Sequence, residues 1–409
     1  MFKYLLPLCV AAWPAYALAE IEPAAPLTLQ AALALAAGAN PELSAARHEV
    51  GAVEGALLQA GLAPNPSLSL ERVDTRRDTR ETTLQLSQPL ELGGKRAARV
   101  QAAERGRDSA AAELALKGAQ LRADVIAAWF AVLGAQEQLR LAREAEDLAQ
   151  RAAAATARRV AAGKVSPVEE TRARVAASSV RLEAMRADSG LATARKRLAG
   201  LWGNTTPRFE RADGAMDALP ALPQLADMAA LQRRLAASPA MALARSQLGR
   251  SQALAQVELS RRAPDLTLSI GGKRSEELGR TQAVFGVSVP LPFFDRNQGN
   301  VLESARRVDK ARDELAATAL RLDAELSQAR EEYELARRQA DALRDDILPG
   351  AQSAYDAAST GFDYGKFGFL DVLDAQRTLL QAKSQYLNTL AEAHRALAAI
   401  DRILGADHE

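Results

Sequence analysis

Residues 64–92 read PNPSLSLERVDTRRDTRETTLQLSQPLEL, a stretch whose pattern of residues indicates two strands joined by a loop. Its two ends, Pro64 to Val73 and Thr82 to Leu92, alternate apolar and polar residues, as a strand with two different faces must. The link between them, Asp74 to Glu81, is a polar loop that belongs in water. Strands of about ten residues have the length that a tilted strand needs to cross a membrane. The alternative is an amphipathic hairpin that packs on the protein's own helices.

The same pattern returns about 200 residues later. Strands are predicted at about 265–270 and 283–291, and the stretch Gly271 to Thr281 between them is predicted to be a polar loop. Asn40-Pro41 aligns with Ser238-Pro239 at an offset of 198, and Ser87-Gln88-Pro89-Leu90 aligns with Ser288-Val289-Pro290-Leu291 at an offset of 201. We therefore predict two repeats, residues 20–203 and 239–405, joined by an irregular equatorial linker, 204–238, and followed by a short tail, 406–409.

Long helices are predicted after each hairpin. Lys95 to Ala162 contains 68 residues without a proline, and at about 1.5 Å per residue such a helix reaches roughly 100 Å. Its counterpart in the second repeat is Asn297 to Thr360. Apolar residues spaced alternately by four and three form a coiled-coil seam there: Leu315, Ala319, Leu322, Leu326, Ala329, Tyr333, Ala336, Ala340, Leu343 and Ile347. Shorter helices are predicted at Pro41 to Leu62, Pro167 to Gly200, Pro239 to Arg262 and Phe369 to Leu404.

The first 19 residues read as a secretory signal peptide, with Lys3, an apolar stretch and the small-x-small ending Ala17-Leu18-Ala19. Cleavage removes Lys3 and the only cysteine, Cys9, which leaves 51 basic and 51 acidic residues. Lipidation at Cys9 is disfavoured because Leu6-Pro7-Leu8 precedes it. No later run has the roughly 18 to 20 apolar residues of a membrane helix, so a membrane-spanning part would consist of strands.

Composition excludes several classes of function. The 409 residues include 52 Lys plus Arg, 51 Asp plus Glu, three His and one Cys. The net charge of +1 gives no basic field for nucleic acid, and the His and Cys counts do not provide the ligands of a zinc or iron–sulfur site. Gly-x-Ser-x-Gly and His-Glu-x-x-His motifs are absent from the sequence. We predict neither a cofactor, nor a metal site, nor an enzyme.

Four strands do not close a barrel, and open strand edges are not tolerated in lipid. Three copies would supply twelve strands, an even number within the usual range. The predicted fold is therefore mostly α with a membrane β-barrel part: a tandem-repeat protomer with long coiled-coil helices and four strands that contribute to a trimeric twelve-stranded barrel.

Three stretches resemble the TolC-like outer-membrane efflux proteins. They are LTLQAALALAAGANPELSAAR (27–47), SQPLELGGKR (87–96) and GKFGFLDVLDAQRTL (365–379), and the one containing Gly93-Gly94-Lys95-Arg96 is most similar to the subgroup that serves cobalt-zinc-cadmium type cation pumps. The resemblance implies a homotrimer in outer-membrane lipid of a Gram-negative bacterium, with a large periplasmic part. It also implies a periplasmic adaptor (membrane fusion) protein and an inner-membrane pump of the resistance-nodulation-division type as partners.

Two acids and two tips are the candidate functional residues. Asp371 and Asp374 lie three apart and hence on one helix face. From spacing alone, complementing the helix dipole is the favoured role; the resemblance implies that they line the periplasmic aperture of the tunnel, where converging carboxylates attract cations. The resemblance also makes the two helix-turn-helix tips the adaptor-contact surface, with the alternative that they are ordinary turns. The tip residues are Gly163, Lys164, Val165, Ser166, Gly365, Lys366 and Phe367, with Phe369 a further apolar contact.

Three functions compete as interpretations of the sequence. The first is a passive exit duct for heavy-metal cations, which a proton-driven inner-membrane pump delivers. The second is the same type of duct for organic compounds or for type I secretion of a polypeptide. The third, from another class, is a soluble periplasmic coiled-coil adaptor.

Overall fold

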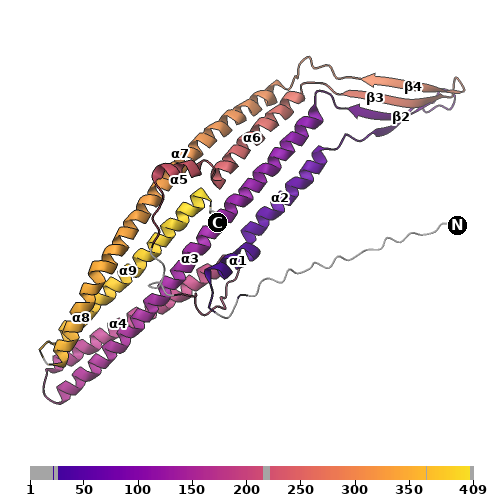
Figure 1. Ribbon diagram of the computed structural model, residues 1–409. Coiled ribbons are helices and arrows are strands. Elements are labelled where there is room, and N and C mark those ends of the chain that lie inside the picture. The colour runs from indigo at the N-terminus through magenta and orange to yellow at the C-terminus, as the bar shows by residue number, and fades with distance from the viewer. Residues whose placement is uncertain (1–21, 23–25, 215–221, 365, 406–409) are drawn as a thin grey trace. The chain divides into compact units, whose positions relative to one another are not determined.

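The computed structural model describes residue 22 and residues 26–214, 222–364 and 366–405 (Figure 1). The predicted signal peptide and the tail 406–409 lie outside the described residues. The chain divides into two compact units. The first takes its residues from 1–41, 124–222 and 334–395, and the second from 42–123, 223–333 and 396–409. Each unit therefore combines segments from both halves of the chain.

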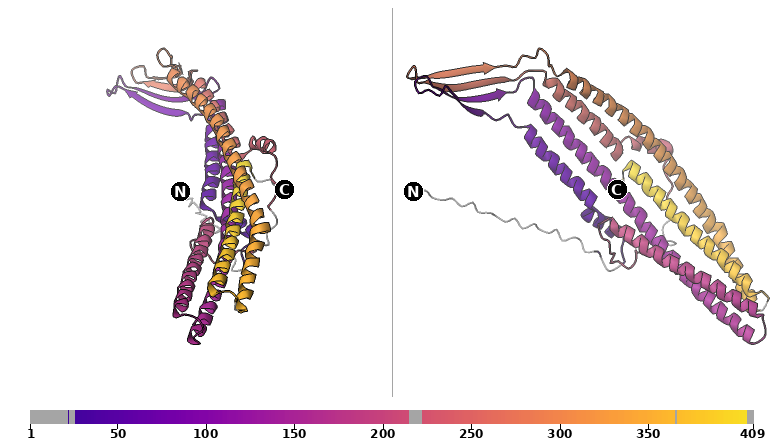
Figure 2. Two further views of the ribbon diagram at one scale, coloured as in Figure 1. Left: turned by 90° about the vertical axis from the view of Figure 1, so that its left-hand side faces the viewer. Right: turned by 180° about the vertical axis from the view of Figure 1, so that it is seen from behind.

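The helices and strands follow the order that the sequence predicts, with additions. The helices are α1 (Leu29–Ala39), α2 (Pro41–Ala60), α3 (Lys95–Ala161), α4 (Pro167–Gly200), α5 (Met228–Leu235), α6 (Pro239–Ser260), α7 (Gln298–Ala342), α8 (Leu348–Asp363) and α9 (Phe369–Leu404), with a π-helical segment, Leu343–Ile347, between α7 and α8. The strands are β1 (Ser67–Val73), β2 (Glu81–Leu90), β3 (Leu266–Ser275) and β4 (Arg280–Ser288). Two further views show the long helices and the strands (Figure 2).

The strands form one antiparallel sheet in the second unit, in the order β1-β2-β3-β4. The register aligns Leu68 with Leu86, Leu86 with Ile270, and Ile270 with Phe285. The two hairpins, one from each half of the chain, are therefore joined through β2 and β3.

The second hairpin is longer than predicted. Gly271 to Ser275, predicted to be loop, belong to β3, and β4 begins at Arg280 rather than at about residue 283. Gly271 faces Gln85 of β2, and a Cβ built on Gly271 would lie 2.4 Å from the Leu84 carbonyl oxygen. Glycine thus permits close approach of two backbones here instead of ending the strand. Lys273 then pairs with Glu81 across the strands at 2.7 Å.

Helix starts follow from capping residues. The Ser166 hydroxyl accepts from the Val168 N–H at 3.3 Å and Pro167 occupies the first turn of α4, where a missing N–H costs nothing. In the second half, Ser238 caps α6 in the same way, with Pro239 after it. The helices predicted to start at Pro167 and at Pro239 therefore both begin at the predicted residue.

The first unit has a core where the N-terminal segment meets α3 and α4. Leu27, Leu133, Leu198 and Phe209 are fully buried. The Trp129 Nε1–H donates to the Leu27 carbonyl at 3.1 Å. Because Leu27 also forms a parallel bridge to Ala212, the start of the described chain is fixed to the segment that follows α4.

The second unit has its core along α7. Leu322, Leu326 and Tyr333 are almost fully buried, as the predicted seam requires. The Tyr333 hydroxyl donates to the Pro223 carbonyl at 2.6 Å, which satisfies the one polar group of this buried ring.

The linker 204–238 is predicted to be irregular, but part of it is helical. Met228–Leu235 form α5, and its Leu231 and Leu235 are buried. The Asp227 carboxylate starts this helix by accepting from the Ala230 N–H at 2.8 Å. Asp227 is a residue type that commonly begins a helix, so this cap is the sequence signal that could have predicted α5.

The coiled-coil seam changes phase at the π-helical segment. Buried seam residues run from Leu322 to Leu343, but Ile347, predicted to continue the seam, is 48% exposed. Pro349 has no N–H for the Asp345 carbonyl and its ring crowds that carbonyl. The chain responds with a wider turn, in which the Leu348 N–H bonds to the Leu343 carbonyl. One extra residue is absorbed, and the seam resumes at Leu348, Ala351, Tyr355 and Ala358.

Within the described residues, no helix has both the length and the apolar character needed to cross a membrane.

Candidate functional site

The sheet has one apolar and one polar face. Side chains at alternate positions expose large apolar groups on one side: Leu68, Leu70, Leu84, Leu86, Leu268, Ile270, Phe285 and Val287. The positions between them carry small or neutral polar groups: Ser69, Gln85, Ser87, Ser269, Gly271 and Gly286. An exposed apolar face of this extent is suited to lipid, and the opposite face is suited to water.

The sheet ends in two open edges. In the described part of the chain, β1 pairs only with β2 and β4 only with β3. Such edges present unpaired backbone N–H and C=O groups to another chain. The sheet is therefore ready to be extended on both sides by further strands.

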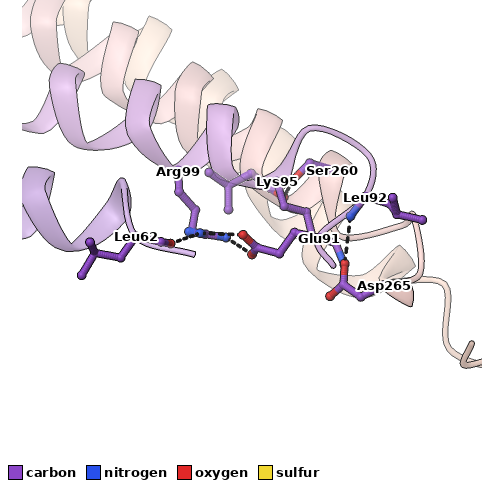
Figure 3. A network of polar contacts seen from close by, with 8 residues as sticks. Leu62, Glu91, Leu92, Lys95, Arg99, Ser260 and Asp265 are labelled. Carbon is purple, nitrogen blue, oxygen red and sulfur yellow. Dashed lines mark hydrogen bonds and ion pairs between the residues drawn. The ribbon is translucent and has the colours of Figure 1, made fainter. Parts of the chain in front are cut away.

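A polar network ties the base of the sheet to the helices of the second unit (Figure 3). The Lys95 ammonium lies 2.6 Å from the Asp265 carboxylate, which also accepts from the Leu92 N–H at 3.2 Å. The Arg99 guanidinium binds Glu91 through both of its terminal nitrogens, and this hydrogen bond raises the pKa of Arg99. Arg99 also donates to the Leu62 carbonyl at 3.3 Å. The network therefore holds four places in the chain together: the end of α2, the end of β2, the start of α3 and the start of β3.

Gly93 completes this junction. Its φ of 70° is in the left-handed region, and a Cβ at this position would lie 2.4 Å from the Ala263 Cβ. Only glycine fits both the backbone conformation and the close packing. The Gly93-Gly94 pair therefore turns the chain from strand into helix at a crowded point.

The first tip, residues 162–166, has the predicted turn geometry. Gly163 has a φ of 69°, and the Lys164 N–H bonds to the Arg159 carbonyl at 2.9 Å, as in a helix end closed by glycine. Lys164 and Val165 are exposed, and Ser166 caps α4. The residues predicted for this tip thus form one exposed turn in the first unit.

The second tip combines an exposed turn with a packed aromatic ring. Lys366 and Phe367 donate backbone N–H groups to the Gly361 carbonyl. The Phe367 ring lies directly over Gly361, where a Cβ would come within 2.2 Å of the ring, yet half of Phe367 is exposed. Gly365 and the side chain of Phe369 lie outside the described residues. The Arg159 guanidinium lies 4.2 Å from the centre of the Phe362 ring, so α3 and α8 are in contact at the tips.

The two predicted aperture acids differ in their contacts. The Asp371 carboxylate accepts from the Gly368 N–H at 2.8 Å, so it caps the start of α9. The Asp374 carboxylate is exposed on the same helix face, one turn further on. Asp371 therefore fills the capping role, and both carboxylates are exposed.

Sequence reasoning missed one partly buried histidine ring. The His394 ring stacks on Phe130 with 3.7 Å between centroids and 6° between planes, and burial lowers the pKa of His394 to about 4. It also missed the contacts of Lys95 with Asp265 and of Arg159 with Phe362, because residues so far apart in sequence carry no spacing signal. In the part of the chain that the structure describes, no group of three or more His, Cys, Asp or Glu side chains is arranged to hold a metal ion.

The comparisons with known proteins define the class. A profile of the outer membrane efflux protein family matches residues 32–204 and 230–406, and the chain belongs to this family. The cobalt-zinc-cadmium resistance protein CzcC of Cupriavidus metallidurans is 50% identical over 384 residues, which cover 94% of this chain and 91% of that protein.

Two solved structures share the fold. A membrane protein from Pseudomonas aeruginosa has a TM-score of 0.79 at 20% identity, and CusC has a TM-score of 0.77 at 19% identity. Each comparison covers 92% of both chains. The predicted resemblance and fold class are confirmed, and the chain is an outer-membrane efflux component.

Proposed function

We propose that this chain is the outer-membrane exit duct of a tripartite efflux system and that it conducts heavy-metal cations passively. The observation that carries the proposal is the four-stranded sheet with one apolar face and two open edges. Because open edges are not tolerated in lipid, the sheet must be closed by other copies. Three copies give a barrel of twelve strands, consistent with the even strand numbers of bacterial outer-membrane barrels.

Similarity to a metal-resistance protein supports the cargo. The relative that is 50% identical over nearly its whole length is named for resistance to cobalt, zinc and cadmium. A duct of this kind does not need to bind its cargo tightly, because conduction requires that ions leave as readily as they enter. Selection of the ion then belongs to the pump.

The partners follow from the same assignment. The two exposed tips, with Lys164, Val165, Lys366 and Phe367, are proposed to contact a periplasmic adaptor, which connects the duct to an inner-membrane proton-driven pump. Residues 1–19 are proposed to be the signal peptide that directs export. Asp374, with Asp371 beside it, is proposed to line the periplasmic aperture in the trimer.

Metal susceptibility of a deletion strain tests the cargo. We expect the strain to lose tolerance to one or more of cobalt, zinc and cadmium, and a plasmid copy to restore it. The matched control is a copy with Gly271→Val, which removes the close approach of β2 and β3 and is expected not to restore tolerance. Unchanged tolerance to these metals, together with increased susceptibility to organic compounds, would assign the duct to another cargo.

A further inference from the structure

The apolar face of the sheet becomes basic at one end. Two residues beyond Leu70 and Leu84 along their strands, the register aligns four polar residues side by side on the same face, one from each strand. They are Arg72, Thr82, Arg274 and Thr281, and we call them the arginine row. Both arginines are exposed. Because β1 follows α2 and β2 leads into α3, the row lies at the turn end of the hairpins, away from the helices.

The acids near the row are directed elsewhere. Glu71 and Glu81 alternate with the row along β1 and β2, so they belong to the polar face of the sheet, where Glu81 pairs with Lys273 at 2.7 Å. In the turn between β1 and β2, the Asp74 carboxylate accepts from the Thr79 hydroxyl at 2.6 Å and from two backbone N–H groups. The acids of these two strands and the first acid of their turn therefore leave the arginine row uncompensated.

One acid, Glu276, lies beside the row. Its carboxylate is 3.6 Å from the Arg274 Nε and 3.9 Å from a terminal nitrogen of Arg80, the next basic residue on this face. Both distances exceed those of a hydrogen bond. In the described part of the chain, Arg72 has no acidic partner within ion-pair distance. Three guanidinium groups thus share one distant carboxylate, and their terminal N–H groups remain available to an anion.

The basic end is also at a defined height. At the other end of the apolar face, the corresponding positions carry no charge: Gln88, Leu90, Leu266 and Leu268. Leu266 and Arg274 are eight residues apart on β3. At about 3.3 Å per residue and a tilt of about 40°, they are separated by roughly 20 Å along the membrane normal, slightly less than the apolar band of about 25 Å in such barrels. The arginine row therefore lies where hydrocarbon meets lipid headgroups.

We propose that the arginine row binds the phosphates of lipopolysaccharide, the glycolipid of the outer leaflet, with the acyl chains lying on the apolar rows beneath it. The proposal rests on the proposed function, because the hairpin turns reach the outer leaflet only if the sheet spans the membrane with the helices in the periplasm. Arginine can bind a phosphate through two parallel N–H···O bonds. The Thr82 and Thr281 hydroxyls alternate with the two arginines and add hydrogen-bond donors.

The spacing of the arginines fits a headgroup with two phosphates. Neighbouring strands are about 4.8 Å apart, so Arg72 on β1 and Arg274 on β3 are separated by about 10 Å at the backbone. The long side chains can widen this distance, which allows each arginine to contact the phosphate at one end of a disaccharide. Gly272 and Ala283, in the row directly beneath, leave room for the arginine stems and for an acyl chain.

Lipid binding to the full-length, detergent-purified protein tests the proposal. The probe is a short-chain lipopolysaccharide that keeps both lipid phosphates, and its Kd is measured by native mass spectrometry. We expect Arg72→Gln with Arg274→Gln to weaken binding by about tenfold or more, because two charge-assisted contacts are lost. Arg72→Lys with Arg274→Lys is expected to fall between this variant and the parent, since lysine keeps the charge and loses the paired N–H groups.

Two controls separate the row from charge in general. Arg76→Gln with Arg77→Gln removes the same charge from the turn between β1 and β2, and we expect a Kd close to that of the parent. The second control keeps the parent protein and removes both phosphates from the lipid, which is expected to weaken binding as much as the glutamine variant does. This arm gives a result even if that variant fails to assemble.

The outcomes that would overturn the proposal are distinct. Equal weakening in the turn variant would assign the effect to total charge and remove the arginine row. Equal affinity for the dephosphorylated lipid, or for phosphatidylglycerol, would exclude recognition of lipopolysaccharide phosphates, and competition by inorganic phosphate at the concentration of the lipid would indicate a site for free phosphate. A trimer that conducts ions but does not bind the lipid would overturn this inference and leave the duct standing, whereas a monomer without current would overturn both.

Discussion

At the residue scale, the ion pair of Lys95 with Asp265 joins the first and second halves of the chain at the base of the sheet. The Lys95 side chain is only 13% exposed. Lys95→Met removes the ammonium and leaves Asp265 with the Leu92 N–H as its partner. We expect a loss of about 1–3 kcal/mol in unfolding free energy, measured by urea unfolding of the detergent-solubilised protein.

An exposed pair provides the control for that measurement. Lys310 and Glu314, one turn apart on α7, are 74% and 59% exposed. Lys310→Met is expected to change the unfolding free energy by less than about 0.5 kcal/mol, as is usual for surface ion pairs. Equal effects of the two substitutions would show that the junction network does not stabilise the sheet base.

His394 gives a prediction of pH dependence. Its folded-state pKa of about 4 lies below the ordinary value of 6.5 because burial against Phe130 disfavours the charged ring. The unfolded chain therefore takes up this proton first as the pH falls, so the stability from this group is complete above about pH 6.5 and is lost toward pH 4. His394→Phe keeps the ring stacking and removes the titration. We expect the melting temperature of the variant to fall less than that of the parent between pH 7 and pH 5, and identical pH profiles would contradict this.

At the element scale, strand β3 is expected to require glycine at position 271 and to tolerate alanine at position 272. Gly271→Ala places a Cβ 2.4 Å from the Leu84 carbonyl oxygen of β2, whereas Gly272→Ala meets only the Thr281 Cγ2 at an ordinary 3.6 Å. We expect Gly271→Ala to reduce strongly the yield of heat-modifiable trimer in the outer-membrane fraction, and Gly272→Ala to leave it near the parent value. A normal yield for both would argue against the β2–β3 register.

Much of the fold was predictable because local signals agree with the final structure. Pro167–Gly200 and Phe369–Leu404 form helices at the predicted residues, since caps and turns mark both ends. The four strands were predicted from alternation alone, because a sheet with one apolar and one polar face shows a period of two. The predicted seam is confirmed from Leu322 through Leu343 for the same kind of reason, and it is wrong at Ile347.

Other features depend on contacts that a linear pattern does not contain. Gly271 and Gly272 resemble loop residues, and only the proximity of β2 shows why glycine is needed inside a strand. Pro349 signals a disturbed helix, but the resulting turn, which moves Ile347 out of the seam, depends on how the backbone absorbs one residue. The sequence predicts both candidate tips as turns. The packing of Phe367 on Gly361 is visible only in the structure.

At the scale of the whole molecule, the aperture acids are predicted to control ion passage. Replacing Asp371 and Asp374 together with Ala is expected to weaken cation preference, because carboxylates that converge in a trimer would no longer attract cations. Leak conductance is expected to rise, because the polar contacts that these carboxylates make at a closed tip would be lost. Asp374→Asn alone separates this effect from capping, since only Asp371 binds the Gly368 N–H. We expect Asp374→Asn to weaken cation preference in planar bilayers with little change in thermal stability.

The control for this prediction is Asp313→Ala, which removes an exposed acid of α7 in the other unit. It is expected to leave conductance and selectivity at the parent values. Selectivity that is unchanged in both the double variant and the control would remove Asp371 and Asp374 from the aperture.

Single-channel conductance of the purified protein in a planar bilayer, with the oligomer mass determined on the same preparation, tests directly whether the protein is a duct. The duct predicts a trimer that inserts into the bilayer and carries a cation-preferring current in discrete steps. A monomer that stays in solution without detergent and produces no current would contradict it, because the apolar face of the sheet would then have to be covered by the chain's own helices.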